Sequence, residues 1–407
     1  MTELTTARPQ RPHLHDLRRD LGTTELANGL IALVFAATGP VAVILAVGTA
    51  GGLSREEISS WIFAVFFLNG IITILASWSF RQPLSFFWTI PGTVVVGKSL
   101  DHLAWPEVLG AFVVTGVLIL VLGMSGWVAR VMSLIPLPLV MAMVAGVFLS
   151  FGTDLVGAVR SDAVIAAPMV LAFLVLSRPG ALGRWMPPVL GALVIGAVAV
   201  AVTAGFTPGT GPILSTPTLQ APVFSTSALL ELVVPLAITV LVVQNGQGVA
   251  VLTAAGHRPP VTFATICCGI GSLLSAAVGG ISSCLTGPTN SLLVASGQRS
   301  RHYAAAITCG TLALAVGLFA PLFVRLMLAA PPAYIATLGG LAMLRALQGA
   351  FVASFAHRFT LGALVTFLVT ITDLTLFNVG GAFWGIVIGL AVSKVLEPDD
   401  FHVQTPA

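Results

Sequence analysis

Two short stretches place a threonine and a proline inside otherwise apolar sequence, a combination that can bind an anion. They are Thr89-Ile90-Pro91 and Thr286-Gly287-Pro288, which share the pattern Thr-x-Pro. Proline is favoured in the first turn of a helix, because its missing N–H would have no partner there. Each stretch therefore predicts a helix that begins within an apolar segment and presents free N–H groups and partial positive charge.

The residues at these helix starts form the first group of candidates for an anion site. They are Pro91, Gly92, Thr93, Pro288, Thr289 and Asn290. The residues just before them, 86–89 and 283–286, are expected to be extended and to pair as short strands. Extended backbone at the depth of a membrane is tolerated only where protein buries it or where it lines a cavity.

Side chains beside the two breaks could hold a small aromatic acid. Phe87 and Trp88 offer rings that can contact an aromatic ring. Hydroxyl groups that can donate to a carboxylate come from Thr89, Ser282, Ser283 and Thr286. A proline kink, simple aromatic packing and helix packing through small polar residues are the alternatives.

Amide side chains in the apolar stretch 228–252 form a second group of candidates. A helix would place Gln244 and Gln247 on one face, with Asn245 beside them. Because buried amides are costly without hydrogen bonds, we expect these three to contact substrate or to join neighbouring helices. Asn28, near the start of the first apolar segment, is a further substrate-binding candidate.

Few titratable groups lie within apolar segments, and they are the candidates for proton coupling. These are Glu231, Asp373 and Glu25. Glu231 lies near the end of its segment, which favours a surface glutamate that reaches the membrane interface, and Asp373 also fits a structural break. The substrate's own acid group as proton carrier, and transport without protons, both remain open.

Composition defines the class of protein that must position these residues. Of 407 residues, 57% are hydrophobic and only 8% charged, and the mean hydropathy is +1.01. A soluble domain would contain about a quarter charged residues, so the chain is predicted to be a polytopic membrane protein. Nucleic acid is not an expected partner. The four cysteines lack metal-ligand spacing, and no metal or cofactor is expected.

Fourteen apolar segments can be distinguished along the chain. They cover residues 27–47, 58–79, 84–97, 107–129, 133–153, 163–177, 186–204, 228–252, 262–278, 283–296, 303–324, 333–353, 359–376 and 380–395. The third and tenth contain the two Thr-x-Pro breaks. Seven segments per half would insert the second half upside down, so the pattern predicts an all-α membrane fold with a 7+7 inverted repeat.

The distribution of basic residues gives the orientation. With the N-terminal tail inside, only Arg55, Lys98, Arg160 and Arg325 of the 18 Lys and Arg residues fall in outer loops. This bias follows the positive-inside rule. We therefore expect cytoplasmic tails at 1–20 and 401–407 and one transmembrane domain at 21–400, with repeats at 21–205 and 226–397. The tail contains no signal peptide pattern.

Three stretches also resemble a known family. RQPLSFFWTIPG (81–92), QNGQGVAVLTAAGHRPP (244–260) and GAFWGIVIG (381–389) are similar to signatures of the benzoate membrane transporter (BenE) family. The resemblance extends from about residue 26 to 396. It differs at Gln247, where the family usually has proline, and at residues 281–284, which replace an Ala-Ile-Asn-Leu run.

The resemblance implies a function and an architecture. The implied function is symport of benzoate, or a similar aromatic carboxylate, with protons across the bacterial inner membrane. The implied architecture is the fourteen-span fold of nucleobase transporters, with a core of segments 1–4 and 8–11 and a gate of segments 5–7 and 12–14. A homodimer formed through the gate helices is also implied.

Other classes of protein share parts of this pattern. A nucleobase transporter usually has acidic residues in segments 8 and 10 to bind ring N–H groups, and this chain has amides and hydroxyls there. A transporter of another small anion, an uncoupled facilitator and a channel share the same hydropathy. An enzyme is not expected, because the sequence contains no paired carboxylates, no H-E-x-x-H motif and no Ser-His pair.

Overall fold

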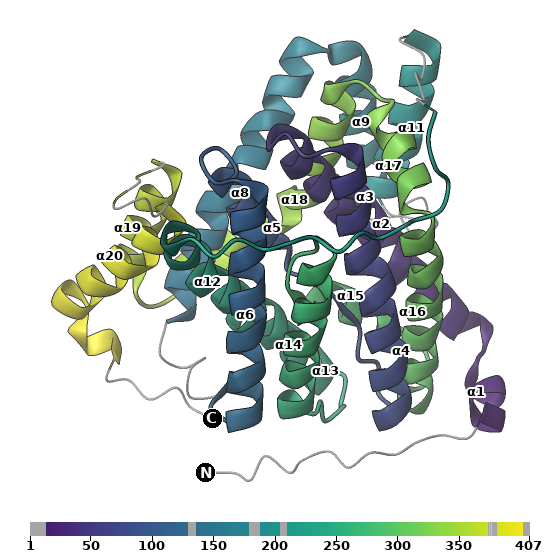
Figure 1. Cartoon of the computed structure of the whole chain (residues 1–407), viewed down its shortest axis with the longest axis horizontal. Coiled ribbons are helices and arrows are strands. Elements are labelled where there is room, and N and C mark those ends of the chain that lie inside the picture. Colours follow the sequence, from purple (N-terminus) through teal and green to yellow (C-terminus); the bar gives the residue numbers. More distant parts are fainter. Residues whose placement is uncertain are drawn as a thin grey trace.

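The computed structural model describes residues 14–128, 136–178, 188–203, 210–372, 374, 376 and 381–401. The chain is mostly helical (Figure 1). The first half contains α1 (Leu14–Asp20), α2 (Thr23–Ala50), α3 (Arg55–Phe63), the π-helix η1 (Ala64–Leu68), α4 (Asn69–Phe80), β1 (Phe86–Trp88), α5 (Ile90–Ser99), α6 (Trp105–Ser125), α8 (Leu137–Ser161), α9 (Ala163–Ser177) and α11 (Pro188–Thr203).

The second half shows the same order of elements, with long helices followed by a short strand and further helices. It contains α12 (Thr226–Ile238), the π-helix η2 (Thr239–Asn245), α13 (Gly246–Ala254), α14 (Val261–Ala277), β2 (Ser283–Leu285), α15 (Gly287–Leu293), the 3-10 turn η3 (Arg299–Arg301), α16 (His302–Leu318), α17 (Ala320–Leu328), α18 (Pro332–Phe355), α19 (Thr360–Ile371), α20 (Gly381–Leu396) and the 3-10 turn η4 (Pro398–Phe401).

Several helices are long and apolar enough to cross a membrane. Six of those described meet this test by length and composition, and they run over 23–50, 55–80, 105–125, 137–161, 226–254 and 332–355. Five shorter apolar helices are α9, α11, α14, α19 and α20. The prediction of a helical membrane protein with many apolar segments is therefore confirmed.

One predicted continuous segment, residues 303–324, is wrong. α16 ends at Leu318 and α17 begins at Ala320, and the two helices are bent by 68°. Pro321 lies in the first turn of α17, where its missing N–H needs no partner. At the end of α16, Ser215 donates from its backbone N–H to the Leu318 carbonyl at 2.8 Å, which stabilises the break.

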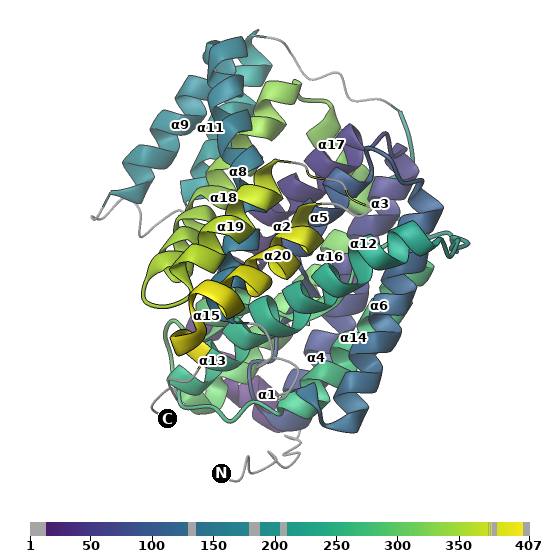
Figure 2. The ribbon, with the colours of Figure 1, turned by 90° about the vertical axis from the view of Figure 1, so that its left-hand side faces the viewer.

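The helices pack in two groups. α2, α4, α6, α14 and α16 lie side by side around the strands, with α6 against α14 and α16 against α2 and α4. α8, α9, α11, α18, α19 and α20 form the second group, in which α8 contacts α18 and α19 (Figure 2). α2 also contacts α18, so the first group is joined to the second along this helix.

An extended segment, residues 210–225, connects the two halves of the chain. It runs across the face of the first helix group between α11 and α12 (Figure 1). The Gln220 N–H donates to the Ala277 carbonyl at 3.0 Å and the Val223 N–H to the Pro106 carbonyl at 2.8 Å. The Gln220 amide oxygen also accepts from Trp105 Nε1 at 2.8 Å. The segment therefore satisfies polar groups at the ends of α6, α14 and α16.

An ion pair attaches α1 to the core. Asp20 accepts hydrogen bonds from Arg81 at 2.8 Å and from the Tyr303 hydroxyl at 3.0 Å. The Arg81 guanidinium lies 5.5 Å from the centre of the Tyr303 ring. Arg81 has φ of 51°, a left-handed conformation that is uncommon for a residue with a side chain. These contacts stabilise that conformation at the turn that leads from α4 to β1.

Candidate functional site

β1 and β2 cross at the centre of the first helix group. They pair antiparallel, with Phe86 opposite Leu285, Phe87 opposite Cys284 and Trp88 opposite Ser283. One further hydrogen bond at each end extends the pairing, from Thr89 N–H to Ser282 and from Thr286 N–H to Ser85, both at 3.2 Å. Every residue of both strands is buried. Short extended segments thus precede α5 and α15.

The start of α5 is closed by its own cap. The Thr89 hydroxyl accepts from the Gly92 N–H at 3.1 Å, and the Thr93 N–H donates to the Thr89 carbonyl at 3.0 Å. The prediction that the N–H near Gly92 is free is therefore wrong, because the threonine of Thr-x-Pro serves as the N-cap. Pro91 lies in the first turn, as proline does at many helix starts.

The start of α15 differs from that of α5. Thr286 occupies the N-cap position but makes no capping hydrogen bond to the helix. Its hydroxyl instead donates to the Ser85 carbonyl at 3.3 Å and contacts the Thr289 hydroxyl. Pro288 lies in the first turn. Hydroxyl groups and an uncapped helix start therefore occur together at α15.

A cavity lies where the strands meet these two helix starts. It is narrow in this conformation, with room for about 10 Å³ or one water molecule, so it must widen to admit an aromatic acid. Its wall is formed by Phe35, Ala36 and Pro40 of α2, Phe87, Trp88 and Ile90 around β1, and Thr286, Pro288 and Thr289 around α15. Aromatic rings on one side thus face threonine hydroxyls on the other.

An aromatic cluster supports the cavity wall. The Trp88 ring packs against Phe66 and Phe87, with ring centres 5.3 and 6.0 Å apart. Trp88 is 1% exposed, and its Nε1 donor has no hydrogen-bond partner among the described residues. A buried donor without a partner is costly. A ligand with an acceptor group at this position would remove that cost.

The Asn290 side chain belongs to the strands rather than to the cavity. Its Oδ1 accepts from the Ser85 N–H at 3.0 Å, and its Nδ2 donates to the Ser85 carbonyl at 3.1 Å. Nδ2 also donates to the Thr286 carbonyl at 2.7 Å. The sequence predicts a free backbone N–H at Asn290, but this N–H donates to the Thr286 carbonyl at 3.4 Å, and the side chain satisfies the strand end.

Asn245 and Asn28 also have structural partners. The Asn245 Oδ1 accepts from the Leu285 N–H at 2.8 Å, which fixes the end of β2 to η2. The Asn28 Nδ2 donates to the Ser296 carbonyl at 3.0 Å, beyond the end of α15. Neither residue lines the cavity. These two amides therefore join neighbouring segments of the protein. Asn245 Nδ2 has no partner among the described residues.

Gln244 and Gln247 have different environments. Gln244 is 3% exposed and lies in η2, whereas Gln247 is exposed and lies in α13. The i, i+3 argument assumes α-helical spacing, and the π-helix that ends at Asn245 changes this spacing. Gln247 packs against Gly287 at the start of α15, where a Cβ on the glycine would lie 2.6 Å from the Gln247 Cβ. Gln244 Oε1 has no partner in the described structure.

Two serines lie at the start of β2, Ser282 just before it and Ser283 as its first residue. Ser282 and Ser283 are fully buried, and their hydroxyls have no hydrogen-bond partner among the described residues. The Ser283 N–H donates to the Ser272 hydroxyl at 3.0 Å. Neither serine lines the cavity in this conformation. They remain substrate-binding candidates only if the cavity widens toward β2.

The three acidic candidates for proton coupling differ in their surroundings. Glu231 is 4% exposed and accepts hydrogen bonds from the Ser99 hydroxyl and from His102, the latter at 2.9 Å. The prediction of a surface glutamate is therefore wrong, because α5 and the turn after it cover this carboxylate. Glu25 accepts from the Gly22 N–H at 3.1 Å and caps α2. Asp373 lies outside the described residues.

Sequence reasoning missed several residues of this region. Phe35 and Pro40 of α2 line the cavity, and the signal available was a proline within an apolar segment. His102 and Ser99 were missed as partners of Glu231, because their contact joins positions far apart in the chain. His257 and His302 are both buried and lie 3.1 Å apart, Nε2 to Nδ1.

Comparison with known proteins gives a consistent family and fold. The family model described as benzoate membrane transport protein matches residues 19–395. The chain is 30% identical over 380 residues to inner membrane protein YdcO of Escherichia coli (strain K12), covering 91% of this chain and 95% of that protein. It is 27% identical over 397 residues to the benzoate membrane transport protein of Acinetobacter baylyi (strain ATCC 33305 / BD413 / ADP1), covering 95% and 98%.

Solved structures show the same fold. The transmembrane domain of a cyanobacterium bicarbonate transporter, BicA, matches with a TM-score of 0.61 at 16% identity, covering 94% of this chain and 99% of that one. SLC26A9 matches with a TM-score of 0.65 at 12% identity, covering 94% of this chain and 66% of that one. At these identities the likeness concerns the fold alone.

Proposed function

Because this chain belongs to the benzoate membrane transport protein family, we propose that it imports benzoate or a related small aromatic carboxylate. A transporter of this family is not an enzyme, and its chemistry is binding and release. The observation that carries the proposal is the cavity between α2 and the crossing strands. Its aromatic wall and threonine hydroxyls suit the two ends of an aromatic acid.

The proposed orientation follows from the chemistry of the cavity wall. The aromatic ring of the substrate packs against Phe35, Phe87 and Trp88. The carboxylate lies beside Thr286 and Thr289, where the Thr289 hydroxyl can donate and the uncapped start of α15 favours negative charge. Thr89, Gly92 and Thr93 do not line the cavity, and they cap the start of α5 instead. Gln244 is the amide that comes into reach if the cavity widens.

The proposed mechanism is alternating access within a repeated fold. The chain crosses the inner membrane fourteen times, both termini are cytoplasmic, and the two halves are inverted repeats. In each half, β1 with α5 and β2 with α15 form a strand and a half-helix at the centre of the membrane. The core, made of α2 to α6 and α12 to α16, moves relative to a gate formed by α8, α9, α11, α18, α19 and α20. Two chains associate through the gate helices.

We further propose that protons accompany the substrate through Glu231. This carboxylate is buried and is hydrogen-bonded to His102 and Ser99, and α5 connects these groups to the cavity. A buried carboxylate beside a partly exposed histidine can exchange a proton when the surrounding helices move. An uncoupled facilitator with the same cavity is the alternative, in which Glu231 has only a structural role.

A nucleobase transporter on the same fold is the competing function. Such a substrate presents ring N–H groups, for which a carboxylate is a stronger acceptor than the threonine hydroxyls that form the polar wall of this cavity. A thermal-shift panel of the purified protein distinguishes the two. Benzoate is expected to raise the unfolding temperature more than uracil at equal concentration. The reverse order would show that the substrate class is wrong.

A further inference from the structure

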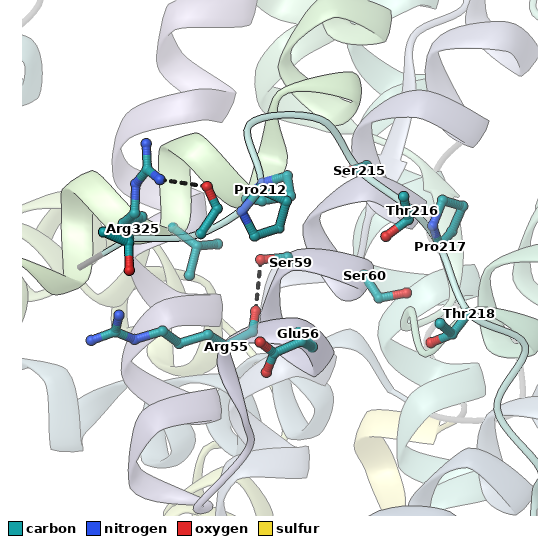
Figure 3. Close-up of a pocket in the computed structure, with 14 residues that line it drawn as sticks. Arg55, Glu56, Ser59, Ser60, Pro212, Ser215, Thr216, Pro217, Thr218 and Arg325 are labelled. Carbon is teal, nitrogen blue, oxygen red and sulfur yellow. Dashed lines mark hydrogen bonds between the residues drawn. The ribbon is translucent and has the colours of Figure 1, made fainter. Parts of the chain in front are cut away.

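A second cavity lies outside the first helix group, between α3, α17 and the connecting segment 210–225 (Figure 3). It has room for about 140 Å³ and is wider than the central cavity. Two arginines, Arg55 and Arg325, contribute to its wall. Several hydroxyl side chains and the backbone of residues 210–218 complete it. No residue of the central cavity lines this pocket.

The charge of this pocket is positive. Arg325 donates from Nη1 to the Gly211 carbonyl at 2.8 Å, and its Nε is buried without a partner among the described residues. Arg55 is exposed and forms no ion pair within the described part of the chain. Glu56 supplies one carboxylate, so two guanidinium groups outweigh one negative charge.

Some hydroxyl groups of the pocket already donate a hydrogen bond within the protein, and others do not. Ser59 donates to the Arg55 carbonyl at 2.6 Å, and Ser215 donates to the Gly317 carbonyl at 2.9 Å. Thr216 forms no hydrogen bond among the described residues and is exposed. An anion beside Arg55 and Arg325 would therefore receive charge from both guanidinium groups, and Thr216 offers a free hydroxyl on the far side of the pocket (Figure 3).

The location of these arginines also needs a reason. The positive-inside rule predicts few basic residues in outer loops, and the sequence has only Arg55, Lys98, Arg160 and Arg325 there. Two of these four line one pocket. A basic residue that only sets the orientation of the protein would lie on the cytoplasmic side of the membrane. The presence of Arg55 and Arg325 in one pocket therefore indicates a function at the outer surface.

We propose that this pocket is an outer docking site that binds the carboxylate group of the substrate before it reaches the central cavity. The inference rests on the proposed transport function. A positively charged recess raises the local concentration of an anion and its association rate, and salt screens both effects. The site contributes to capture, so it affects the concentration dependence of uptake and leaves the maximal rate unchanged.

Uptake kinetics test the capture role. Benzoate uptake from the outside is compared between wild type, Arg55→Gln and Arg160→Gln, which removes an exposed charge expected on the same side. Arg55→Gln is expected to raise KM by about tenfold, to keep the maximal rate and to reduce the salt dependence, while Arg55→Lys restores KM. Equal KM values in Arg55→Gln and wild type, or equal effects of Arg55→Gln and Arg160→Gln, would overturn the proposal.

A binding measurement separates this site from the transport function. Thr218, which lies across the pocket from Arg55 (Figure 3), is replaced by cysteine and labelled with an environment-sensitive fluorophore. Three native cysteines are buried and Cys267 is half-buried. Sodium benzoate at constant ionic strength is expected to change the fluorescence saturably, and Arg55→Gln to abolish this response. A response without any uptake would refute the transport function alone, and no response in wild type would refute the docking site.

Discussion

The side chain of Asn290 pairs with the backbone of Ser85 as a neighbouring strand would. It accepts from the Ser85 N–H at 3.0 Å and donates to the Ser85 carbonyl at 3.1 Å, so both polar groups of Ser85 are satisfied beyond the end of β1. The two residues are fully buried. The contact fixes the start of α15 against the first strand, and it therefore determines the position of the threonines that line the cavity.

Replacing Asn290 should destabilise the fold. Asn290→Ala leaves the buried N–H of Ser85 without its partner, at a cost of about 1–3 kcal/mol for an unsatisfied group, whereas the Ser85 carbonyl still accepts from Thr286. Asn290→Asp keeps the acceptor but, when ionised, donates no hydrogen bond. It should therefore destabilise the protein less at a pH where its carboxyl is partly protonated. Thermal unfolding in detergent measures both. Ser291→Ala, at an exposed neighbour with a local bond only, is the control, and equal unfolding temperatures for the Asn290→Ala and Ser291→Ala variants would contradict the pairing.

Gly248 should not tolerate a side chain. An ideal Cβ at this position would lie 2.5 Å from the Leu285 carbonyl oxygen, so Gly248→Ala must push β2 away from α13. Overpacking of this kind costs about 1–3 kcal/mol. Gly349→Ala is the matched control, because no atom lies within 4 Å of its added Cβ. A lower unfolding temperature and weaker benzoate binding are expected for Gly248→Ala only, and unchanged binding would count against the close approach.

The Asp20 ion pair should give a pH-dependent contribution to stability. Burial raises the pKa of this carboxyl, but hydrogen bonds from Arg81, Tyr303 and Arg19 lower it more, so the pKa is below its usual range. A lowered pKa means that the stabilisation is complete above the ordinary aspartate pKa and is lost as the pH falls through the folded-state value. The difference in unfolding temperature between wild type and Asp20→Asn should therefore be largest near about pH 7 and shrink only as the pH falls below the ordinary aspartate value of 3.8. A difference that grows on acidification would refute the ion pair.

Removing the carboxylate of Glu231 should separate proton coupling from transport. In vesicles with an inward proton gradient, wild-type uptake of benzoate should be stimulated, and Glu231→Gln should lose this stimulation. Exchange of labelled for unlabelled benzoate at equal pH on both sides should persist in the variant, because it needs no net proton movement. Glu107→Gln, which alters only a helix cap at Ala104, should behave as wild type. Stimulation that survives in Glu231→Gln would assign this residue a structural role.

Local chemistry explains what could be predicted from the sequence. Thr-x-Pro marked both places where a strand gives way to a helix, because proline restricts its own conformation and threonine can cap the helix. The apolar runs predicted the helices, because their length and composition are also local properties of the sequence. The break between α16 and α17 was missed, since the Ser215 backbone that stabilises it comes from a distant segment.

The roles of the polar residues could not be predicted in the same way. Asn245, Asn28 and Asn290 each form a hydrogen bond to a backbone group more than one segment away, and a sequence does not specify such partners. Gln244 and Gln247 were assigned to one face because α-helical spacing was assumed, and a π-helix intervenes. The burial of Glu231 depends on α5, whose position is set by the pairing of the two strands.

Calorimetric titration of benzoate into Thr289→Val tests most directly whether the substrate carboxylate lies at the start of α15. Valine preserves the shape of threonine and removes the hydroxyl that faces the cavity. Loss of a hydrogen bond to a charged group is expected to weaken binding by about 10- to 100-fold, whereas Thr311→Val, whose hydroxyl bonds only within α16, should bind as wild type. Unchanged benzoate affinity in Thr289→Val, with the wild type binding normally, would contradict the proposed site.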